Sequence, residues 1–303
     1  MDKSLYLAPF KHEDDLLKEL AFKNIKVLET RGRAVLAEGL REDIIWAQSA
    51  WIGVLEIAIT SIKDGAKKLR ELNRNWALFS TGQHRRAELI QNELPHYPTK
   101  PIPFLAARPT QPMGGWTLWE NDLIIASAQT TSLYPIGEMT FEEDQINPPS
   151  RAYLKLWEFF TCHSPRLPNA SEHLLDMGAC PGGWTWVLQS FGGAVTAVDK
   201  APLEKRIAEL PRVSLLNESA FGLAPNRIDK VDWFFSDIIC YPERLLTLVG
   251  HWREAGVKNF VCTIKYQAET DFAVTHQFLE KFGGNIIHQH HNKHEVTWFL
   301  IES

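Results

Sequence analysis

The sequence predicts an α/β protein, with a doubly wound, mostly parallel sheet in its C-terminal half and a smaller α+β domain before it. Apolar strands alternate with helices from Arg151 onward, a pattern typical of parallel sheets that are covered on both faces. The paired prolines in Asn147–Ser150 end the preceding segment, because proline cannot continue a helix. The composition, 45% hydrophobic and 23% charged over 303 residues, is that of a globular chain of about two domains. We therefore expect domains at residues 1–146 and 147–303.

The N-terminal domain is expected to begin with a strand at Leu5–Phe10 and a charged helix at Glu13–Phe22. Strands follow at Ile25–Glu29 and Ala34–Glu38, and a basic helix at Ile62–Asn75. The cations of this helix are Lys63, Lys67, Lys68, Arg70 and Arg74. A basic face suits RNA phosphates, but a solvated helix face explains the same charges, so both interpretations stay open.

In the C-terminal domain the sequence predicts six strands and three long helices. The strands are His173–Met177, Ala194–Asp199, Val231–Asp237, Asn259–Lys265, Asn285–His290 and Glu295–Ile301. The helices are Gly183–Phe191, Pro242–Ala255 and Glu269–Phe282. The short link between the last two strands predicts an antiparallel hairpin at one edge. A mostly parallel sheet that ends in one reversed strand is typical of Rossmann-like methyltransferases rather than dehydrogenases.

The segment HLLDMGACPGGWTWVLQSFGGAVTAVDK indicates a ligand site. A buried strand ends at Asp176, and a helix begins near Trp184. The turn between them contains Gly178, Gly182 and Gly183. Glycines let the backbone approach a ligand closely, and free N–H groups at a helix start favour a carboxylate or phosphate. Asp199 closes the next strand, where a carboxylate can accept both hydroxyls of a ribose.

The ligand that fits this segment best is S-adenosylmethionine. A dinucleotide would require G-x-G-x-x-G, whereas Pro181 interrupts the glycines here, and a pyrophosphate has no use for the Asp176 carboxylate. The cationic amino group of S-adenosylmethionine, in contrast, would be attracted to that carboxylate. A plain strand–turn–helix without a ligand is disfavoured by Asp176 and Asp199 together. The expected cofactor residues are Asp176, Gly178, Cys180, Pro181, Gly182, Gly183, Trp184 and Asp199.

Charged residues at strand ends indicate which atom accepts the methyl group. Asp237, Lys265 and Glu295 lie at ends of expected strands, and Lys155 lies on the helix before the sheet. Lone charges at such positions are usually solvated, but Lys265 ends an apolar strand at the edge where open α/β sheets bind ligands. A ribose 2′-hydroxyl must lose its proton as it attacks the sulfonium methyl. Lysine serves as the base where a cationic neighbour, here Lys155, and partial desolvation lower its pKa.

The segments SRAYLKL, DMGACPGGWT, VDWFFSDIICYPE, TIKY and HEVTWFL together resemble the FtsJ-like ribose 2′-O-methyltransferases over residues 148–303. Within this family the sequence is most similar to the RlmM-type enzymes, which methylate a cytidine ribose in large-subunit ribosomal RNA. The resemblance implies a catalytic set of Lys155, Asp237, Lys265 and Glu295, with Lys265 as the base and Asp237 also at the cofactor. Where the family usually has an aspartate for the adenine amino group, this chain has Ser219, with Glu218 adjacent, so the resemblance implies that Ser219 is a cofactor residue.

The N-terminal segments LYLAPFKHEDDLLKELA and ENDLIIASAQTTSLYPIGEMTFEED resemble the THUMP-bearing region of the same branch, which presents RNA. The resemblance therefore implies a THUMP-like RNA-presenting domain at residues 1–146.

Three other features are assigned no chemistry. His288 and His290 would share one face of an extended strand near His291 and His294, but no cysteine or carboxylate set with ligand spacing completes a metal site. Cys180 lies in the cofactor loop rather than over a base pocket, so we do not expect a nucleophile there. Asn147–Ser150, NPPS, precedes the glycine turn and lacks an aromatic residue, so we expect a linker.

The sequence thus predicts an S-adenosylmethionine-dependent RNA ribose 2′-O-methyltransferase with ribosomal RNA as its partner, without a metal or a membrane. A net charge of −5 argues against a polybasic binder. The start MDKSLYLAPFKHEDD lacks the pattern of a signal peptide, so we expect a cytoplasmic protein. Two alternatives stay open: a non-catalytic RNA-binding protein on a methyltransferase fold, and a methyltransferase for a base nitrogen or a small molecule.

Overall fold

The computed structural model describes residues 2–97, 100–110 and 113–302. The chain divides into two compact units, Met1–Phe141 and Glu142–Ser303. The division falls a few residues before the paired prolines of Asn147–Ser150. Among the described residues, no helix has the length and apolar character needed to cross a membrane.

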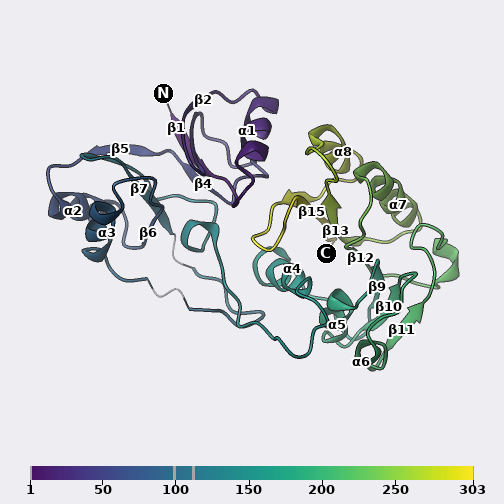
Figure 1. Ribbon diagram of the computed structural model, residues 1–303. Coiled ribbons are helices and arrows are strands. Elements are labelled where there is room, and N and C mark those ends of the chain that lie inside the picture. The colour runs from purple at the N-terminus through teal and green to yellow at the C-terminus, as the bar shows by residue number, and fades with distance from the viewer. Residues whose placement is uncertain (1, 98–99, 111–112, 303) are drawn as a thin grey trace. The chain divides into compact units, whose positions relative to one another are not determined.

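The strands of the N-terminal unit form two four-stranded sheets within the described residues (Figure 1). The first has the order β2-β3-β1-β4, and its elements are β1 (Lys3–Leu7), α1 (Glu13–Phe22), β2 (Val27–Arg31), β3 (Ala34–Glu38) and β4 (Ser49–Ile52). The second has the order β5-β8-β7-β6, and its elements are β5 (Leu55–Ala58), α2 (Ile62–Leu72), β6 (Trp76–Leu78), α3 (His84–Asn92), β7 (Gly114–Glu120) and β8 (Leu123–Ser127). The unit is therefore richer in strands than the small α+β domain that we expected, although α1 and β3 have the expected bounds.

Two apolar clusters hold this unit together. The first joins the two sheets through Leu5, Leu7, Ala34, Leu36, Trp51, Trp119 and Ile125. Trp51 packs directly on Gly115, where a Cβ would lie 2.2 Å from the ring atom Cε2. The second cluster attaches α2 and α3 to the second sheet, with Ala66 and Leu69 buried on α2. The opposite face of α2 thus carries its basic side chains.

The C-terminal unit contains a seven-stranded sheet in its described residues, with the order β11-β10-β9-β12-β13-β15-β14. The strands are β9 (His173–Met177), β10 (Ala194–Val198), β11 (Val213–Leu216), β12 (Trp233–Ser236), β13 (Asn259–Lys265), β14 (Asn285–Ile287) and β15 (Glu295–Leu300). Strands β9 to β13 pair in parallel, and β15 pairs antiparallel with both β13 and β14.

This sheet confirms the expected α/β class and the terminal hairpin, with three corrections. The edge strand β11 was not expected. The reversed strand β15 lies between β13 and β14 rather than at the end of the sheet. Strand β14 ends at Ile287, not at His290.

The helices cover the sheet in two groups. They are α4 (Tyr153–Glu158), α5 (Gly183–Gln189), α6 (Lys205–Ala208), α7 (Pro242–Glu254) and α8 (Phe272–Phe282). Helix α4 packs against α5, and α7 packs against α8, and Figure 1 shows the two pairs on opposite sides of the sheet. The chain runs outward from β9 in one direction and from β12 in the other. The boundary between β9 and β12 is therefore the topological switch point, where open α/β sheets bind ligands at the carboxyl ends of the strands.

Candidate active site

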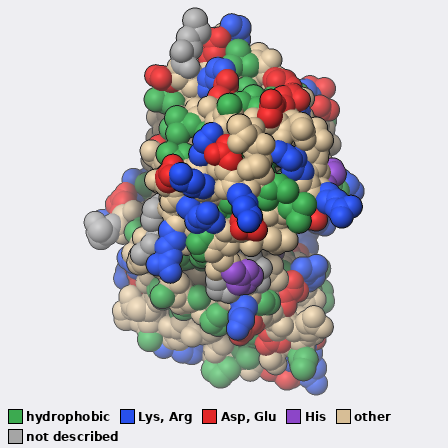
Figure 2. Space-filling model, turned by 90° about the vertical axis from the view of Figure 1, so that its left-hand side faces the viewer, with side chains coloured by type: hydrophobic (Ala, Val, Ile, Leu, Met, Phe, Trp, Pro, Cys, Tyr) green, Lys and Arg blue, Asp and Glu red, His purple; other side chains and the backbone are tan. Residues whose placement is uncertain are grey.

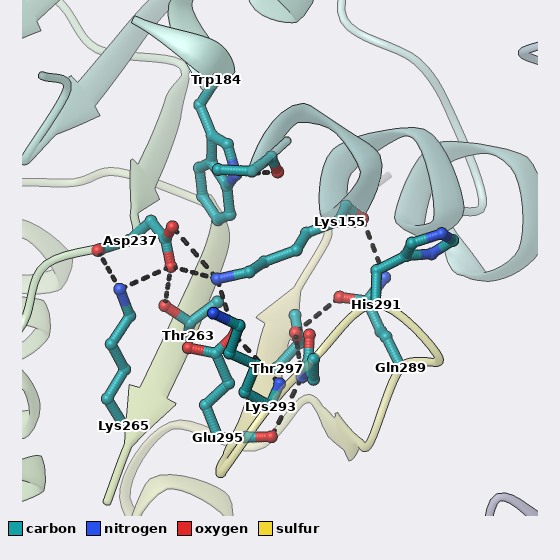
Figure 3. A network of polar contacts seen from close by, with 12 residues as sticks. Lys155, Trp184, Asp237, Thr263, Lys265, Gln289, His291, Lys293, Glu295 and Thr297 are labelled. Atoms are coloured by element: carbon teal, nitrogen blue, oxygen red, sulfur yellow. Dashed lines mark hydrogen bonds and ion pairs between the residues drawn. The ribbon is translucent and has the colours of Figure 1, made fainter. Parts of the chain in front are cut away.

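Lys155, Asp237, Lys265 and Glu295 lie together at the carboxyl edge of the sheet, beside the switch point (Figure 3). Asp237 follows β12, and Lys265 is the last residue of β13. Because β15 runs in the opposite direction, its first residue, Glu295, lies opposite Lys265 in the pairing register. Helix α4 supplies Lys155. The four residues implied by the family resemblance thus form one cluster.

Asp237 is the centre of the cluster. The Nζ atom of Lys155 donates to its two carboxylate oxygens at 2.9 and 3.1 Å. The Nζ atom of Lys265 lies 3.0 Å from Oδ1 of Asp237 and donates to its backbone oxygen at 2.6 Å. The hydroxyl of Thr263 donates to the same Oδ1 at 2.6 Å. Lys155 also lies 2.6 Å from Oε1 of Glu295, so its ammonium group bridges two carboxylates.

Burial and charge together fix the ionisation of two members of this cluster. Burial by itself lowers the pKa of Lys155, but the carboxylates of Asp237 and Glu295 outweigh it, and the pKa of Lys155 is raised. Burial by itself raises the pKa of Asp237, but Lys155 and Lys265 outweigh it, and that pKa is lowered. Lys155 is therefore an ammonium and Asp237 a carboxylate at neutral pH.

The glycine turn between β9 and α5 lies against the loop that carries Asp237. Gly178 has a φ of +82°, and a Cβ there would lie 2.5 Å from Cγ1 of Ile238. Gly182 has a φ of +114°, and a Cβ there would lie 2.7 Å from Cγ2 of Ile207. Both positions require glycine, because other residues rarely adopt such angles and the space is filled.

Asp199 fixes the same turn from the end of β10. Its Oδ2 accepts a hydrogen bond from the backbone N–H of Cys180 at 3.1 Å. Its Oδ1 accepts one from the N–H of Ala201 at 2.9 Å. Each oxygen has a further lone pair, so the carboxylate can still accept hydroxyl groups of a ligand. The expected residues Pro181 and Gly183 complete the turn and begin α5.

Asp176, in β9 beneath this turn, is only 1% exposed. The hydroxyl of Thr185 donates to its Oδ2 at 2.6 Å. Burial, with smaller contributions from the charges of Asp237 and Asp199, raises the pKa of Asp176 to about 7. The turn thus covers a carboxyl group whose pKa a nearby cation would lower, so that it would lose its proton at neutral pH.

Three expected cofactor residues have surroundings that the sequence did not indicate. The indole of Trp184 is buried, and its Nε1 donates to the backbone oxygen of Ala152 at 3.0 Å, which ties α5 to the start of α4. Burial and the charge of Asp199 raise the pKa of the Cys180 thiol, which disfavours a thiolate nucleophile. Ser219 follows β11, and the Glu218 carboxylate beside it is paired with Arg227 at 2.6 Å.

The histidine-rich segment lies next to the cluster but is not the extended strand that we expected. Its backbone turns after Ile287 because the carboxylate of Glu158 on α4 accepts the N–H groups of His290 and His291, at 2.7 and 3.0 Å. Across the described residues, no three His, Cys, Asp or Glu side chains are grouped so that they could hold a metal ion.

Glu158 and Gln289, which hold this segment, were not among the site residues that the sequence predicted. The available signal was the charge of Glu158 within the aromatic run WEFF, three residues after Lys155 and on the same helix face. A charge at such a position is buried and needs a partner.

A doubly wound sheet with a reversed strand, a glycine turn at its switch point and acidic residues beneath and beside that turn define a Rossmann-like methyltransferase fold. Residues 148–288 match the family described as FtsJ-like methyltransferase. The C-terminal unit is therefore similar to FtsJ-like methyltransferases over the segment that contains the glycine turn and the cluster members Lys155, Asp237 and Lys265.

Similar proteins carry the name Ribosomal RNA large subunit methyltransferase M. The one from Halorhodospira halophila is 32% identical over 159 residues, which cover 50% of this chain and 46% of that protein. The one from Aggregatibacter aphrophilus is 28% identical over 169 residues, 50% of this chain and 47% of that protein. The match thus spans about half the length of these relatives. Among solved structures, the fibrillarin pre-rRNA processing protein of Methanococcus jannaschii is 20% identical over 48% of this chain and 74% of its own, with a TM-score of 0.38, too low for any inference.

Proposed function

We propose that the chain is an S-adenosylmethionine-dependent methyltransferase that modifies a ribose 2′-hydroxyl of RNA, and that its substrate is large-subunit ribosomal RNA. The observation that carries the proposal is the cluster of Lys155, Asp237, Lys265 and Glu295 beside the glycine turn. The match of residues 148–288 to FtsJ-like methyltransferases and the names of the relatives support it.

The residues at the glycine turn fit S-adenosylmethionine. The buried carboxyl of Asp176, with its pKa raised to about 7, would be stabilised in its ionised form by the cationic amino group of the cofactor. The free lone pairs of Asp199 suit the hydroxyls of the cofactor ribose. When bound, the cofactor supplies a methyl group that its sulfonium already activates.

We assign the base to Lys265. Lys155 is held by two carboxylates and has a raised pKa, so it remains a cation and orients Asp237 and Glu295. Among the described residues, Lys265 has an ion pair with one carboxylate, that of Asp237. In the proposed step the neutral amine of Lys265 takes the proton of the 2′-hydroxyl while the oxygen bonds to the methyl carbon. The bond from that carbon to sulfur breaks in line, and S-adenosylhomocysteine leaves as a neutral thioether.

We propose further that the N-terminal unit is THUMP-like and contacts RNA. The side of the molecule that carries α2 and α3 displays many Lys and Arg side chains, with Asp and Glu among them (Figure 2). The exposed cations of these helices include Lys63, Lys67, Arg70 and Arg85, whereas the exposed Arg74 follows α2, which ends at Leu72 rather than at Asn75 as expected. Phosphate contacts of this kind weaken steeply as the salt concentration rises. Binding of ribosomal RNA fragments that is unaffected by salt or by replacing these residues would contradict the assignment.

The proposed function is tested by methyl transfer from labelled S-adenosylmethionine to protein-free ribosomal RNA, followed by nuclease digestion and mass spectrometry. A new 2′-O-methyl nucleoside is expected. A base-methylated product, or transfer that persists when the target 2′-hydroxyl is replaced by hydrogen, would establish a different acceptor. RNA binding without cofactor binding would establish a non-catalytic RNA-binding protein instead.

A further inference from the structure

We propose that Glu158 and Gln289 are positioning residues that hold the loop 288–294 against α4 and thereby place Glu295 beside Lys155. We call Glu158, Gln289 and this loop the α4 clasp. Its kinetic consequence rests on the proposed function, whereas the positioning itself can be measured without RNA.

The first attachment of the clasp is the carboxylate of Glu158, which is 2% exposed. It accepts the backbone N–H groups of His290 and His291 and lies 2.7 Å from Nδ1 of His291. Burial by itself raises the pKa of Glu158, but His291, with a smaller effect of His163, outweighs it and lowers the pKa. A buried carboxylate with three donors is a strong anchor, because hydrogen bonds to an ionised group are shorter and stronger than neutral ones.

The second attachment is Gln289, which is 1% exposed and joins α4 to β15. Its Nε2 donates to the backbone oxygen of Lys155 at 2.9 Å. Its Oε1 accepts a hydrogen bond from the hydroxyl of Thr297 at 2.6 Å, and Thr297 lies two residues after Glu295 in β15. Asn292 adds a bond from its Nδ2 to the backbone oxygen of Glu295 at 3.2 Å.

Both attachments hold the loop 288–294, which leads directly to Glu295. Lys155 and Glu158 lie three residues apart on one face of α4, so α4 holds the cluster with one side chain and the loop with the other. Figure 3 shows Gln289 and His291 on the α4 side of this loop, and Glu295 and Lys155 approaching each other at its other end. Since Glu295 is the first residue of β15, its place depends on the loop before it as well as on its pairing with Lys265. Without the clasp, we expect the salt bridge between Lys155 and Glu295 to open.

Lysine labelling followed by mass spectrometry tests this directly in the full chain. In the wild-type protein the Lys155 side chain is 12% exposed, whereas that of Lys205 is 88% exposed and serves as an internal reference. With an amine-reactive ester, we expect Lys155 to be labelled at least about fivefold faster in Glu158→Gln and in Gln289→Met, because local opening exposes it. Labelling of Lys205 should not change. The Gln289→Met variant keeps the size and charge of the side chain, so it also answers the question if Glu158→Gln does not fold.

Asp232→Asn is the matched control. Asp232 also accepts a backbone N–H, that of His173, at 2.9 Å, but at the amino end of β9, away from the cluster. This variant should lose stability without faster labelling of Lys155. Unchanged Lys155 labelling in both clasp variants, or equal acceleration in Asp232→Asn, would overturn the proposal.

Measurements of the transfer rate and of cofactor affinity distinguish failure of the clasp proposal from failure of the proposed function. In single-turnover assays, we expect Glu158→Gln to slow methyl transfer about tenfold or more, because small displacements of reacting groups are costly. The dissociation constant for S-adenosylmethionine should stay within about twofold of wild type, since the glycine turn lies between β9 and α5 and forms no part of the clasp. If the wild-type protein transfers no methyl group, the proposed function fails while the labelling result still decides the positioning. If wild type and both clasp variants transfer at equal rates, the clasp proposal fails.

Discussion

Cofactor affinity is predicted to depend on pH through Asp176. Burial raises the pKa of this carboxyl from 3.8 to about 7 in the protein without a ligand. At about pH 6 most molecules therefore hold it protonated, and binding a cofactor with a cationic amino group requires its ionisation. Because Asp176 is almost fully buried, we expect it to act through its charge from beneath the Gly178 turn rather than by a direct contact.

The magnitude follows from this pKa. If the bound cofactor keeps Asp176 ionised, the observed dissociation constant is multiplied by one plus the ratio of protonated to ionised carboxyl. That factor is about 11 at pH 6 and about 1.3 at pH 7.5. Affinity should therefore rise about eightfold over this interval, which corresponds to about 1.3 kcal/mol. Binding at neutral pH should release about half a proton.

Titration calorimetry of S-adenosylmethionine in two buffers of different ionisation enthalpy measures both quantities. The Asp176→Asn variant is the control, because it keeps the size of the side chain and an acceptor for Thr185 but does not titrate. It should bind weakly and with little dependence on pH. A wild-type affinity that is flat from about pH 6 to about pH 7.5, or an equal slope in Asp176→Asn, would refute the reasoning.

The raised pKa of Asp176 also makes the stability of the cofactor-free protein depend on pH. The folded-state pKa of this carboxyl is raised above the ordinary value of 3.8, so between these two values the folded state binds more protons than the unfolded state. Stability from this group therefore falls as the pH rises from about 4 to about 7 and is constant above that range. Thermal unfolding of wild type minus that of Asp176→Asn should show this slope.

Three further substitutions test other parts of the structure. Lys265→Ala should abolish methyl transfer and leave cofactor affinity within about twofold of wild type; unchanged turnover would exclude Lys265 as the base. Asp199→Ala should weaken cofactor binding about tenfold or more and also cost about 1 kcal/mol of stability, because the N–H groups of Cys180 and Ala201 lose their acceptor; calorimetry and denaturant unfolding measure the two effects. Gly115→Ala should destabilise the N-terminal unit by about 1–3 kcal/mol, because its Cβ would overlap Trp51; an unchanged denaturant midpoint would contradict that packing.

The C-terminal sheet was predictable because its central strands are buried on both faces and stand out as apolar runs. Strand β11 was missed because Val213–Leu216 is short and half-exposed at the edge, with an exposed Ser214. Three strands of the first N-terminal sheet were expected, at Leu5–Phe10, Ile25–Glu29 and Ala34–Glu38, but β4 and the second sheet, whose strands have three to seven residues, were missed. Their partners are distant in sequence, as when β1 pairs with both β3 and β4, and short strands take their identity from neighbours that a single sequence does not reveal.

The cluster residues were predictable from the sequence, whereas the contacts that support them were not. Asp237 and Lys265 lie at the carboxyl ends of parallel strands, which meet at one edge, so their proximity followed from the fold class. Glu295 begins the antiparallel strand β15, and its place in the set was implied by the family resemblance. The contacts of Glu158 join residues that are 132 and 133 positions apart, and no periodicity connects them. The expected strand through His290 was wrong for this reason, because a carboxylate took the backbone N–H groups that a strand would have paired.

The reversed strand β15 determines that the loop 288–294, which α4 holds, lies directly before a member of the cluster. Asp237 and Lys265 follow or end strands whose whole length is anchored in the sheet before the functional residue is reached. Glu295 begins its strand, so the chain approaches it through the loop 288–294, and sheet pairing constrains it from one side alone. Glu158 and Gln289 supply the constraint on the other side, from the helix that also carries Lys155. The position of the Glu295 carboxylate is therefore set by α4 as much as by β15, which is why Gln289→Met, a change without charge, should alter the exposure of Lys155.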